Sequence, residues 1–392
     1  MRWRILALLF AARIGMGFQF QTMASVGDPL AKAFGLDHAE IGLMIGLFMA
    51  PGLFLALPAG FAGRFASDRM LAGGGLVVLA LGGTLSAIAA EPGGVGLGRL
   101  LAGAGSLFAT LYLSKMVVDW FEGREIATAM SILVMSWPFG IAMGQVGHAW
   151  LAELYGWRVP FAVAAGYCAL AALAVFAVYR PPNDLARIAT GRITRLLPRE
   201  SGLIVCAGIA WGVFNAGYVV YLSFGPKMLE AQGIGPLAAA SVISVGSWLM
   251  ILSGAACGQI ADRTGRRETI LAVCMTGAVA ALLLLSLPGA GLAASVIFGI
   301  LGMAPAGVII ALAGQAVAPE RRAFGMGVFF TVYFAILTAT PPVAGWILDR
   351  SGPFGTILFG AALFALVLPL VILFRTLKPK APVRLPQKSA RC

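Results

Sequence analysis

The sequence predicts an all-α membrane protein in which twelve transmembrane helices form two pseudo-symmetric bundles of six. Three observations predict this fold: an apolar composition, twelve long apolar runs, and a repeat that relates the two halves of the chain. Of the 392 residues, 60% are hydrophobic and only 11% are charged, whereas a soluble domain carries about 25% charged residues. This composition argues against a soluble enzyme, a nucleic-acid-binding module and a disordered chain. Because one spanning helix takes about 20 residues, twelve spans with short loops use up the chain.

The apolar runs follow one another along the whole chain. Prolines and glycines inside them do not exclude a membrane span, because neighbouring helices can satisfy the freed backbone groups. The first run lacks a small-residue cleavage site, so we expect a retained helix instead of a signal peptide. The runs lie at about 4–34, 39–62, 70–90, 94–117, 125–151, 157–179, 202–228, 236–259, 268–287, 290–314, 323–347 and 354–374.

The basic residues predict how these runs are grouped and oriented. With the N-terminus inside, 22 of the 28 Lys and Arg fall on the inner side and four on the outer side, which places both termini in the cytoplasm. Residues 1–179 and 201–376 are the two expected bundles, 180–200 a cytoplasmic linker, and 377–392 a basic cytoplasmic tail. The basic residues of these inner loops and of the tail thus account for the net charge of +12. The excess of Arg over Lys is typical of GC-rich bacterial genomes, so we expect the bacterial inner membrane.

The two halves match when the sequence is shifted by 198 residues. Ser25-Val26-Gly27 then falls on Ser223-Phe224-Gly225, and Gly60 falls on Gly258. In membrane proteins with repeated halves, the substrate site lies near the membrane midplane between the repeats, which rock to open it to either side. The repeat therefore favours a transporter over a channel or a membrane enzyme.

A charged motif with the sequence GQIADRTGRR follows the eighth run, at 258–267. It resembles the loop signature G-x-x-x-D-R-x-G-R-R of the major facilitator superfamily at every defined position, and RLLAGAG at 99–105 is similar to the superfamily's R-x-x-x-G-x-G. The resemblance covers the whole chain and implies a transporter of two six-helix bundles. It also implies a conformational latch made of Gly258, Asp262, Arg263, Gly265 and Arg266. In the equivalent loop after the second run, Arg64 replaces the acid, and Asp68 is the candidate substitute.

Three segments, 13–29, 115–121 and 136–140, resemble cyanate-permease-type members of this superfamily. That resemblance implies a small organic or inorganic anion as the substrate. The chain has no G-x-x-x-x-G-K-[ST] phosphate loop, so ATP-driven pumping is not supported and no cofactor is expected. The five scattered cysteines include no C-x-x-C pair, which predicts neither a metal site nor a disulfide framework.

Arg13 is the charge deepest in the first run. On a helical wheel it shares one face with Gly17, Gln21, Ala24 and Asp28. A charge inside the membrane costs about 2.5–3.5 kcal/mol on insertion scales, so it requires a reason. We expect Arg13 to attract the anionic group of the substrate and Gln21 to donate a hydrogen bond to it. The alternative is that Arg13 extends towards the cytoplasmic surface.

The superfamily resemblance implies that the first, fourth, seventh and tenth helices line the cavity. Shifting the polar face of the first run by 198 residues gives Trp211, Asn215 and Tyr218 as substrate-binding candidates in the seventh run. Packing is the alternative role of Trp211 and Tyr218.

Asp28, near the outer end of the first run, and Arg99, which opens the fourth run from the same side, are the proton-coupling candidates. Protonation of Asp28 would release a paired Arg99; a static ion pair is the alternative. His38 and His148 are placed near the outer edge, so a relay of protons through histidine is not expected.

These observations favour a secondary transporter, not an enzyme, that moves a small anion with protons. The expected partners are that solute, protons and membrane lipids, without nucleic acid, and the chain is expected to be a monomer. A drug/proton antiporter is the second hypothesis, supported by Arg99 with Asp28 and opposed by the lack of a second deep acid. A membrane sensor or scaffold without transport activity is the third.

Overall fold

The computed structural model describes residues 2–121, 125–182, 196–318 and 321–378. Within these ranges the chain is helical and contains no strand. The predicted tail from residue 379 onward and most of the predicted linker, 183–195, lie outside the described residues. The first half holds α1 (Arg2–Ser25), α2 (Gly27–Phe34), α3 (His38–Leu47), α4 (Pro51–Ala62), α5 (Asp68–Ile88), α6 (Pro92–Phe121), α7 (Ile126–Tyr155) and α8 (Arg158–Val178). The second half holds α9 (Pro198–Glu230), α10 (Pro236–Thr264), α11 (Arg267–Leu285), α12 (Gly291–Ile297), η1 (Phe298–Gly302), α13 (Ala306–Ala316) and α14 (Arg322–Leu377).

The helices confirm the predicted fold class. Eleven helical segments are long and apolar enough to cross a membrane, and the last of them, Phe324–Leu377, has 54 residues, enough for two spans. Its kink is at Gly352, where φ is 70° and ψ is −177°, a conformation open to glycine because it has no Cβ. Two further spans are interrupted: α3 and α4 form one, and α12, η1 and α13 form another. In the predicted linker, α9 already begins at Pro198.

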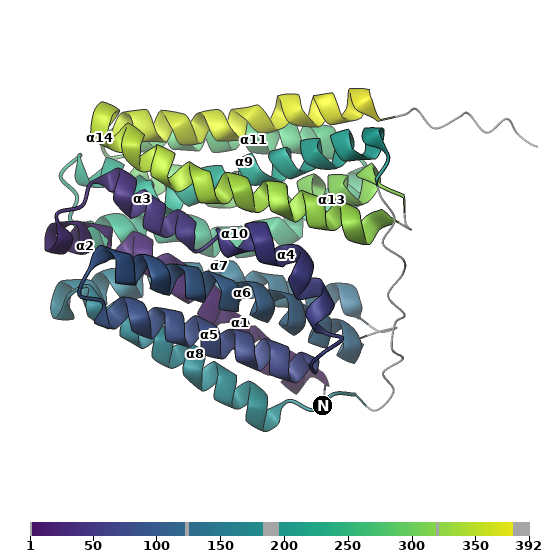
Figure 1. Cartoon of the computed structure of the whole chain (residues 1–392). Helices are drawn as coiled ribbons and strands as arrows, with labels where there is room; N and C mark the ends of the chain where they lie inside the picture. The colour runs from purple at the N-terminus through teal and green to yellow at the C-terminus, as the bar shows by residue number, and fades with distance from the viewer. Residues whose placement is uncertain (1, 122–124, 183–195, 319–320, 379–392) are drawn as a thin grey trace, which may run out of the picture.

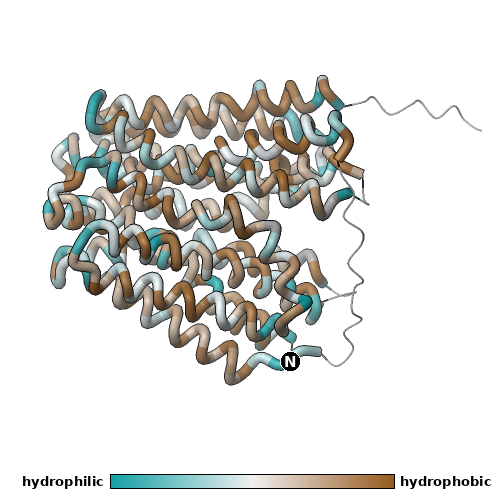
Figure 2. The backbone as a smooth tube through the Cα atoms, viewed as in Figure 1, coloured by the Kyte–Doolittle hydropathy of each residue, from teal (hydrophilic) through white to brown (hydrophobic). Residues whose placement is uncertain are grey.

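The two halves lie side by side, with α1 and α5–α8 in the lower part of Figure 1 and α9, α11 and α14 in the upper part, while α3 lies against α14. Helix α1 begins and helix α14 ends on the same side of the molecule, which we call the terminal face. We call the opposite side, where both α2 and α3 begin, the far face. Figure 2 shows apolar segments along the helices and polar ones mainly at their ends. Large apolar side chains point outward from both halves, for example Phe54, Leu170, Leu252 and Ile372, each more than 60% exposed, as expected of helices that face lipid.

Glycines bring the two halves into close contact along α3 and α14. A Cβ on Gly46 would overlap the carbonyl oxygen of Thr338, and one on Gly345 would overlap that of His38. Gly42 likewise packs on the carbonyl of Pro341. Small residues allow helix backbones in membranes to approach closely, so this seam sets how tightly the halves close.

Candidate functional site

The far face is the end at which charged side chains join the halves. His38 Nδ1 lies 2.6 Å from Asp349 Oδ1. The same carboxylate accepts hydrogen bonds from the backbone N–H groups of His38 (3.3 Å) and Ala39 (3.0 Å). Asp349 therefore adds to the cap that Asp37 already forms on α3, because it accepts from two further N–H groups at a helix start where the dipole favours a negative charge.

A second ion pair crosses the halves at the far face, between Asp28 and Lys227. Asp28 lies in the first turn of α2, after the break that ends α1, and Lys227 lies in the last turn of α9. Lys227 Nζ is also 2.8 Å from Glu230 Oε2. The sequence-based pairing of Asp28 with Arg99 is therefore not formed in this conformation, because Lys227 occupies the carboxylate.

Arg99 instead has a full set of backbone partners. Its side chain is completely buried and donates to the carbonyl oxygens of Met44 (3.2 Å), Gln19 (3.0 Å) and Phe20 (3.2 Å). The guanidinium carbon lies 4.6 Å from the centre of the Phe48 ring, a cation–π distance. Arg99 thus holds α6 against α1 and α3, and its hydrogen-bonding capacity is largely used inside the protein.

Arg13 differs from Arg99 in having few partners. Its side chain is 8% exposed, and Nη1 donates to the carbonyl oxygen of Leu133 in α7 at 2.8 Å. Nε is buried without a hydrogen-bond partner. The described residues show no ion pair for Arg13. A guanidinium has five N–H donors, and the described residues show one acceptor for Arg13, so most of its hydrogen-bonding capacity is unused.

Further buried polar groups lie between α1 and α7, towards the far face from Arg13. Gln21 Nε2 donates weakly to Ser25 Oγ at 3.3 Å, while Gln21 Oε1 has no partner. His148, placed at the outer edge by its sequence position, is completely buried. Its Nε2 donates to the carbonyl of Phe18 at 3.0 Å and lies 3.1 Å from Thr22 Oγ1. His148 is therefore held inside the first half, because α7 turns its side chain towards α1.

The candidates on α9 divide into two groups. Trp211 is partly buried and stacks on Tyr333 of α14, with 6.3 Å between ring centres, and Asn215 Nδ2 donates to the Trp211 carbonyl at 2.8 Å. Tyr218 points elsewhere: its hydroxyl lies 3.1 Å from Ser247 Oγ in α10. In this conformation Tyr218 is part of the interior of the second half and does not offer its hydroxyl to the space between the halves.

The predicted latch residues form contacts within each half. Asp262 Oδ1 lies 2.9 Å from Arg267 Nη2, between exposed side chains, and Gly265 ends α10 with φ of 68°. Gly258, Arg263 and Arg266 are exposed at this loop. Asp68 pairs with Lys115 at the end of α6. At the same terminal face Glu200 of α9 binds Arg321 at 2.7 Å, so these ion pairs hold helices of one half together.

A cavity of about 360 Å³ opens between the halves at the far face. Charged residues of its lining are Asp28, Lys32, His38, Glu153, Lys227 and Glu230. Lys227 is not among the site residues predicted from the sequence, and its role between the halves comes from the structure. The repeat is the feature of the sequence that could have pointed to Lys227, because it aligns Pro226-Lys227 with Asp28-Pro29.

Known proteins similar to this chain agree with this architecture. A model of the Major Facilitator Superfamily matches residues 7–336. The cis,cis-muconate transport protein of Acinetobacter baylyi is 25% identical over 395 aligned residues, covering 92% of each chain. A probable sugar efflux transporter of Haemophilus influenzae is 25% identical over 62% of this chain and 61% of its own. A gallate transporter of Pseudomonas putida is 26% identical over 40% of this chain and 35% of its own.

Among solved structures, a bacterial homolog of the human lysosomal transporter Spinster, in an inward-facing and occupied conformation, superposes with a TM-score of 0.73 at 15% identity. The match covers 96% of each chain. At this identity the likeness shows the fold alone.

Proposed function

The chain belongs to the Major Facilitator Superfamily, and on that premise we propose that it transports a small organic anion together with protons by alternating access. Rocking of two repeated halves around a central site is the general mechanism of such folds. The proposed location is the bacterial inner membrane, with the terminal face in the cytoplasm, because the Lys and Arg excess lies on that side. We also propose that the transporter works as a monomer.

The observation that carries the anion proposal is the contrast between the two buried arginines. Arg99 is satisfied by three carbonyls, whereas Arg13 has one carbonyl and an unpartnered Nε. Removing a charge from water is costly unless an opposite charge compensates it. A substrate carboxylate would supply that charge, and the planar guanidinium can bind it through two N–H groups.

The opposite half supports a planar, unsaturated acid as the substrate class. By the repeat, Trp211 is the residue equivalent to Arg13, and it stacks with Tyr333. Aromatic faces suit flat π systems. A muconate and a gallate transporter are among the relatives, and both of these solutes are unsaturated carboxylates.

We place proton coupling at Asp28, with Lys227 as its partner in place of Arg99. The ion pair joins the halves at the far face, so a proton on Asp28 would weaken this contact and favour opening towards that face. The static ion pair is the competing role, and it predicts that transport does not depend on a proton gradient.

The test is uptake by purified protein in proteoliposomes. We expect cis,cis-muconate or gallate uptake to increase with an inward proton gradient and to fall about thirtyfold or more in Arg13→Gln, because losing one side of a buried charged contact costs about 2–5 kcal/mol. Arg350→Gln is the matched control, since that arginine lies over the exposed Trp346 ring, and it should transport normally.

Two results would contradict the proposal. Movement of lipophilic cations that Arg13→Gln leaves unchanged would instead support the drug/proton antiporter. Absence of transport for every anion and cation, by protein that remains monodisperse, would favour the sensor or scaffold.

A further inference from the structure

We propose that the far-face cavity is a second anion-binding site, in which Lys227 takes a small carboxylate from the far side once Asp28 has gained a proton. The proposal rests on the proposed anion transport and adds a place where the anion is bound before it reaches Arg13. Its volume of about 360 Å³ is within the range of small-ligand pockets, which runs from about 300 to 1,000 Å³.

The charges around the cavity form a switch centred on one ammonium group. Lys227 contacts the carboxylates of Asp28 and Glu230, and its side chain is only 19% exposed. The other charged groups of the lining are Lys32 on α2, His38 on α3 and Glu153 on α7, while α10 contributes Pro236, Leu237 and Ala240. With both carboxylates ionised, the two acids and Lys227 together carry a net charge of −1, so the site repels an anion.

Two buried polar atoms in the lining point to a missing ligand. Gln145 Oε1 and Ser223 Oγ have no hydrogen-bond partner, although their side chains are 2% and 7% exposed and both residues line the cavity. Buried polar groups are nearly always hydrogen-bonded in folded proteins. The Ser223 hydroxyl can donate to an oxygen of a ligand held by Lys227.

The repeat places a second serine at the same cavity. Ser25 is the equivalent of Ser223 under the shift of 198 residues, and it also lines the cavity. The matched segments therefore meet at one site, and each half contributes one hydroxyl to it. A site shared in this way is sensitive to how the halves rock.

The charge balance couples one proton to one anion. A proton from water on the far side binds a carboxylate oxygen of Asp28, and a carboxylate of the solute replaces that oxygen at Lys227. The total charge of the cavity is then unchanged, so binding of the pair avoids the cost of adding a net charge to a partly buried site.

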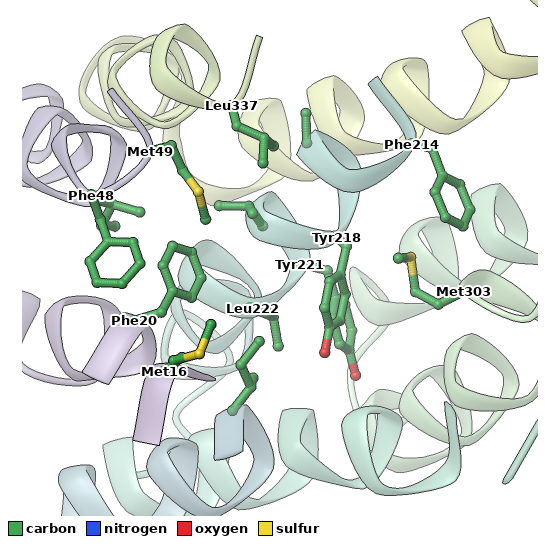
Figure 3. Close-up of a cluster of buried hydrophobic side chains, with 14 of the residues drawn as sticks. Met16, Phe20, Phe48, Met49, Phe214, Tyr218, Tyr221, Leu222, Met303 and Leu337 are labelled. Carbon is green, nitrogen blue, oxygen red and sulfur yellow. The ribbon is translucent and has the colours of Figure 1, made fainter. Parts of the chain in front are cut away.

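An apolar layer from both halves lies beside the cavity lining. Figure 3 shows one buried cluster with residues from both halves. The first half contributes Phe20 of α1 and Met49, and the second contributes Leu222 of α9 and Leu337 of α14. The carbonyl of Leu222 accepts a hydrogen bond from Gln145 Nε2 at 3.0 Å, which links this layer to the cavity lining.

The test uses the charge selectivity of the cavity and needs no known substrate. Ala149, which lines the cavity, is changed to Cys, and its labelling by a sulfonate-bearing methanethiosulfonate is compared with that by a trimethylammonium-bearing one. We expect the ratio of anionic to cationic labelling to be about tenfold higher in Asp28→Asn than with Asp28 intact, because the substitution removes one negative charge beside Lys227. The ratio cancels differences in the amount of folded protein.

Variants assign the effect to its residues. In Lys227→Gln, the gain from Asp28→Asn should be lost, because the ammonium that attracts the anionic reagent is absent. Lys32→Gln is the matched control, a lysine in the same lining for which the described residues show no ion pair, and it should keep the gain from Asp28→Asn. No gain in Asp28→Asn, or a gain of the same size in the Lys227→Gln background, would overturn the proposal.

Arg13→Gln separates this proposal from the proposed function. It should keep the labelling response while muconate or gallate uptake is lost. Normal labelling with uptake that does not depend on Arg13 would contradict the proposed function alone, and normal Arg13-dependent uptake without the labelling response would contradict the second site alone.

Discussion

At the scale of single residues, the two buried arginines show that burial by itself does not identify a binding group. Both Arg13 and Arg99 are inside the membrane-spanning region and both have little or no exposure. Their partners distinguish them: Arg99 has three carbonyls and the Phe48 ring, while Arg13 has one carbonyl. The first arrangement stabilises the fold, and the second leaves donors for a ligand.

This difference predicts that substituting Arg99 mainly lowers stability, whereas substituting Arg13 mainly lowers transport. We expect Arg99→Gln to reduce stability by about 3 kcal/mol or more, because several hydrogen bonds to a charged group are lost at about 1.5–3 kcal/mol each. Arg13→Gln should lose transport with a much smaller change in stability. Thermal denaturation of both variants in detergent gives the measurement, and an equal loss of melting temperature in the two would show that Arg13 is structural as well.

At the scale of elements, the seam between α3 and α14 controls the approach of the halves. Gly46 and Gly345 contact backbone carbonyls of the opposite half directly, so no side chain fits there while the far face is closed. Gly254 of α10 is a helical glycine outside this seam, and a Cβ at its position would lie in open space.

We therefore expect Gly46→Ala and Gly345→Ala to force the far face open and to slow transport. The added methyl groups overlap carbonyl oxygens in the closed state, and backbone cannot move aside as a flexible side chain can. Gly254→Ala is the control and should be neutral or slightly stabilising, since Ala favours a helix over Gly by about 0.5–1 kcal/mol. Labelling of Ala149→Cys from the far side reports the opening, and unchanged labelling in both seam variants would show that the seam does not limit closure.

At the scale of the whole molecule, charged contacts join the halves at the far face, and ion pairs at the terminal face hold each half together. Asp28 with Lys227 and His38 with Asp349 form the first set. Asp68 with Lys115 and Glu200 with Arg321 belong to the second. This distribution is what we expect of the state that is closed at the far face.

Asp349 should contribute more to this closure than His38. Its carboxylate keeps two backbone N–H donors of α3 even without the imidazole, and an N-terminal cap is worth about 0.5–2 kcal/mol. We expect Asp349→Ala to increase amide hydrogen exchange at the start of α3 about tenfold, and His38→Ala to increase it less. Equal exchange in the two variants would mean that the ion pair, and not the cap, holds the helix.

The sequence by itself determined the class of the molecule. Its composition and apolar runs specify spanning helices, because a chain in lipid must satisfy its backbone groups internally, and the 258–267 loop with the repeat indicates the family and two related halves. Arg13 could be singled out because a charge inside a span is costly wherever it lies.

Only the tertiary structure decided which groups meet. Asp28 binds Lys227 across 199 positions of sequence, Arg99 turns to carbonyls of α1 and α3, and His148 and Tyr218 point into their own halves. Helix phase predicts the face on which a residue lies, but a break such as that between α1 and α2 resets it. Hydrogen-bond partners supplied by backbone carbonyls carry no residue-specific signal, so the sequence cannot show that Arg99 is satisfied and Arg13 is not.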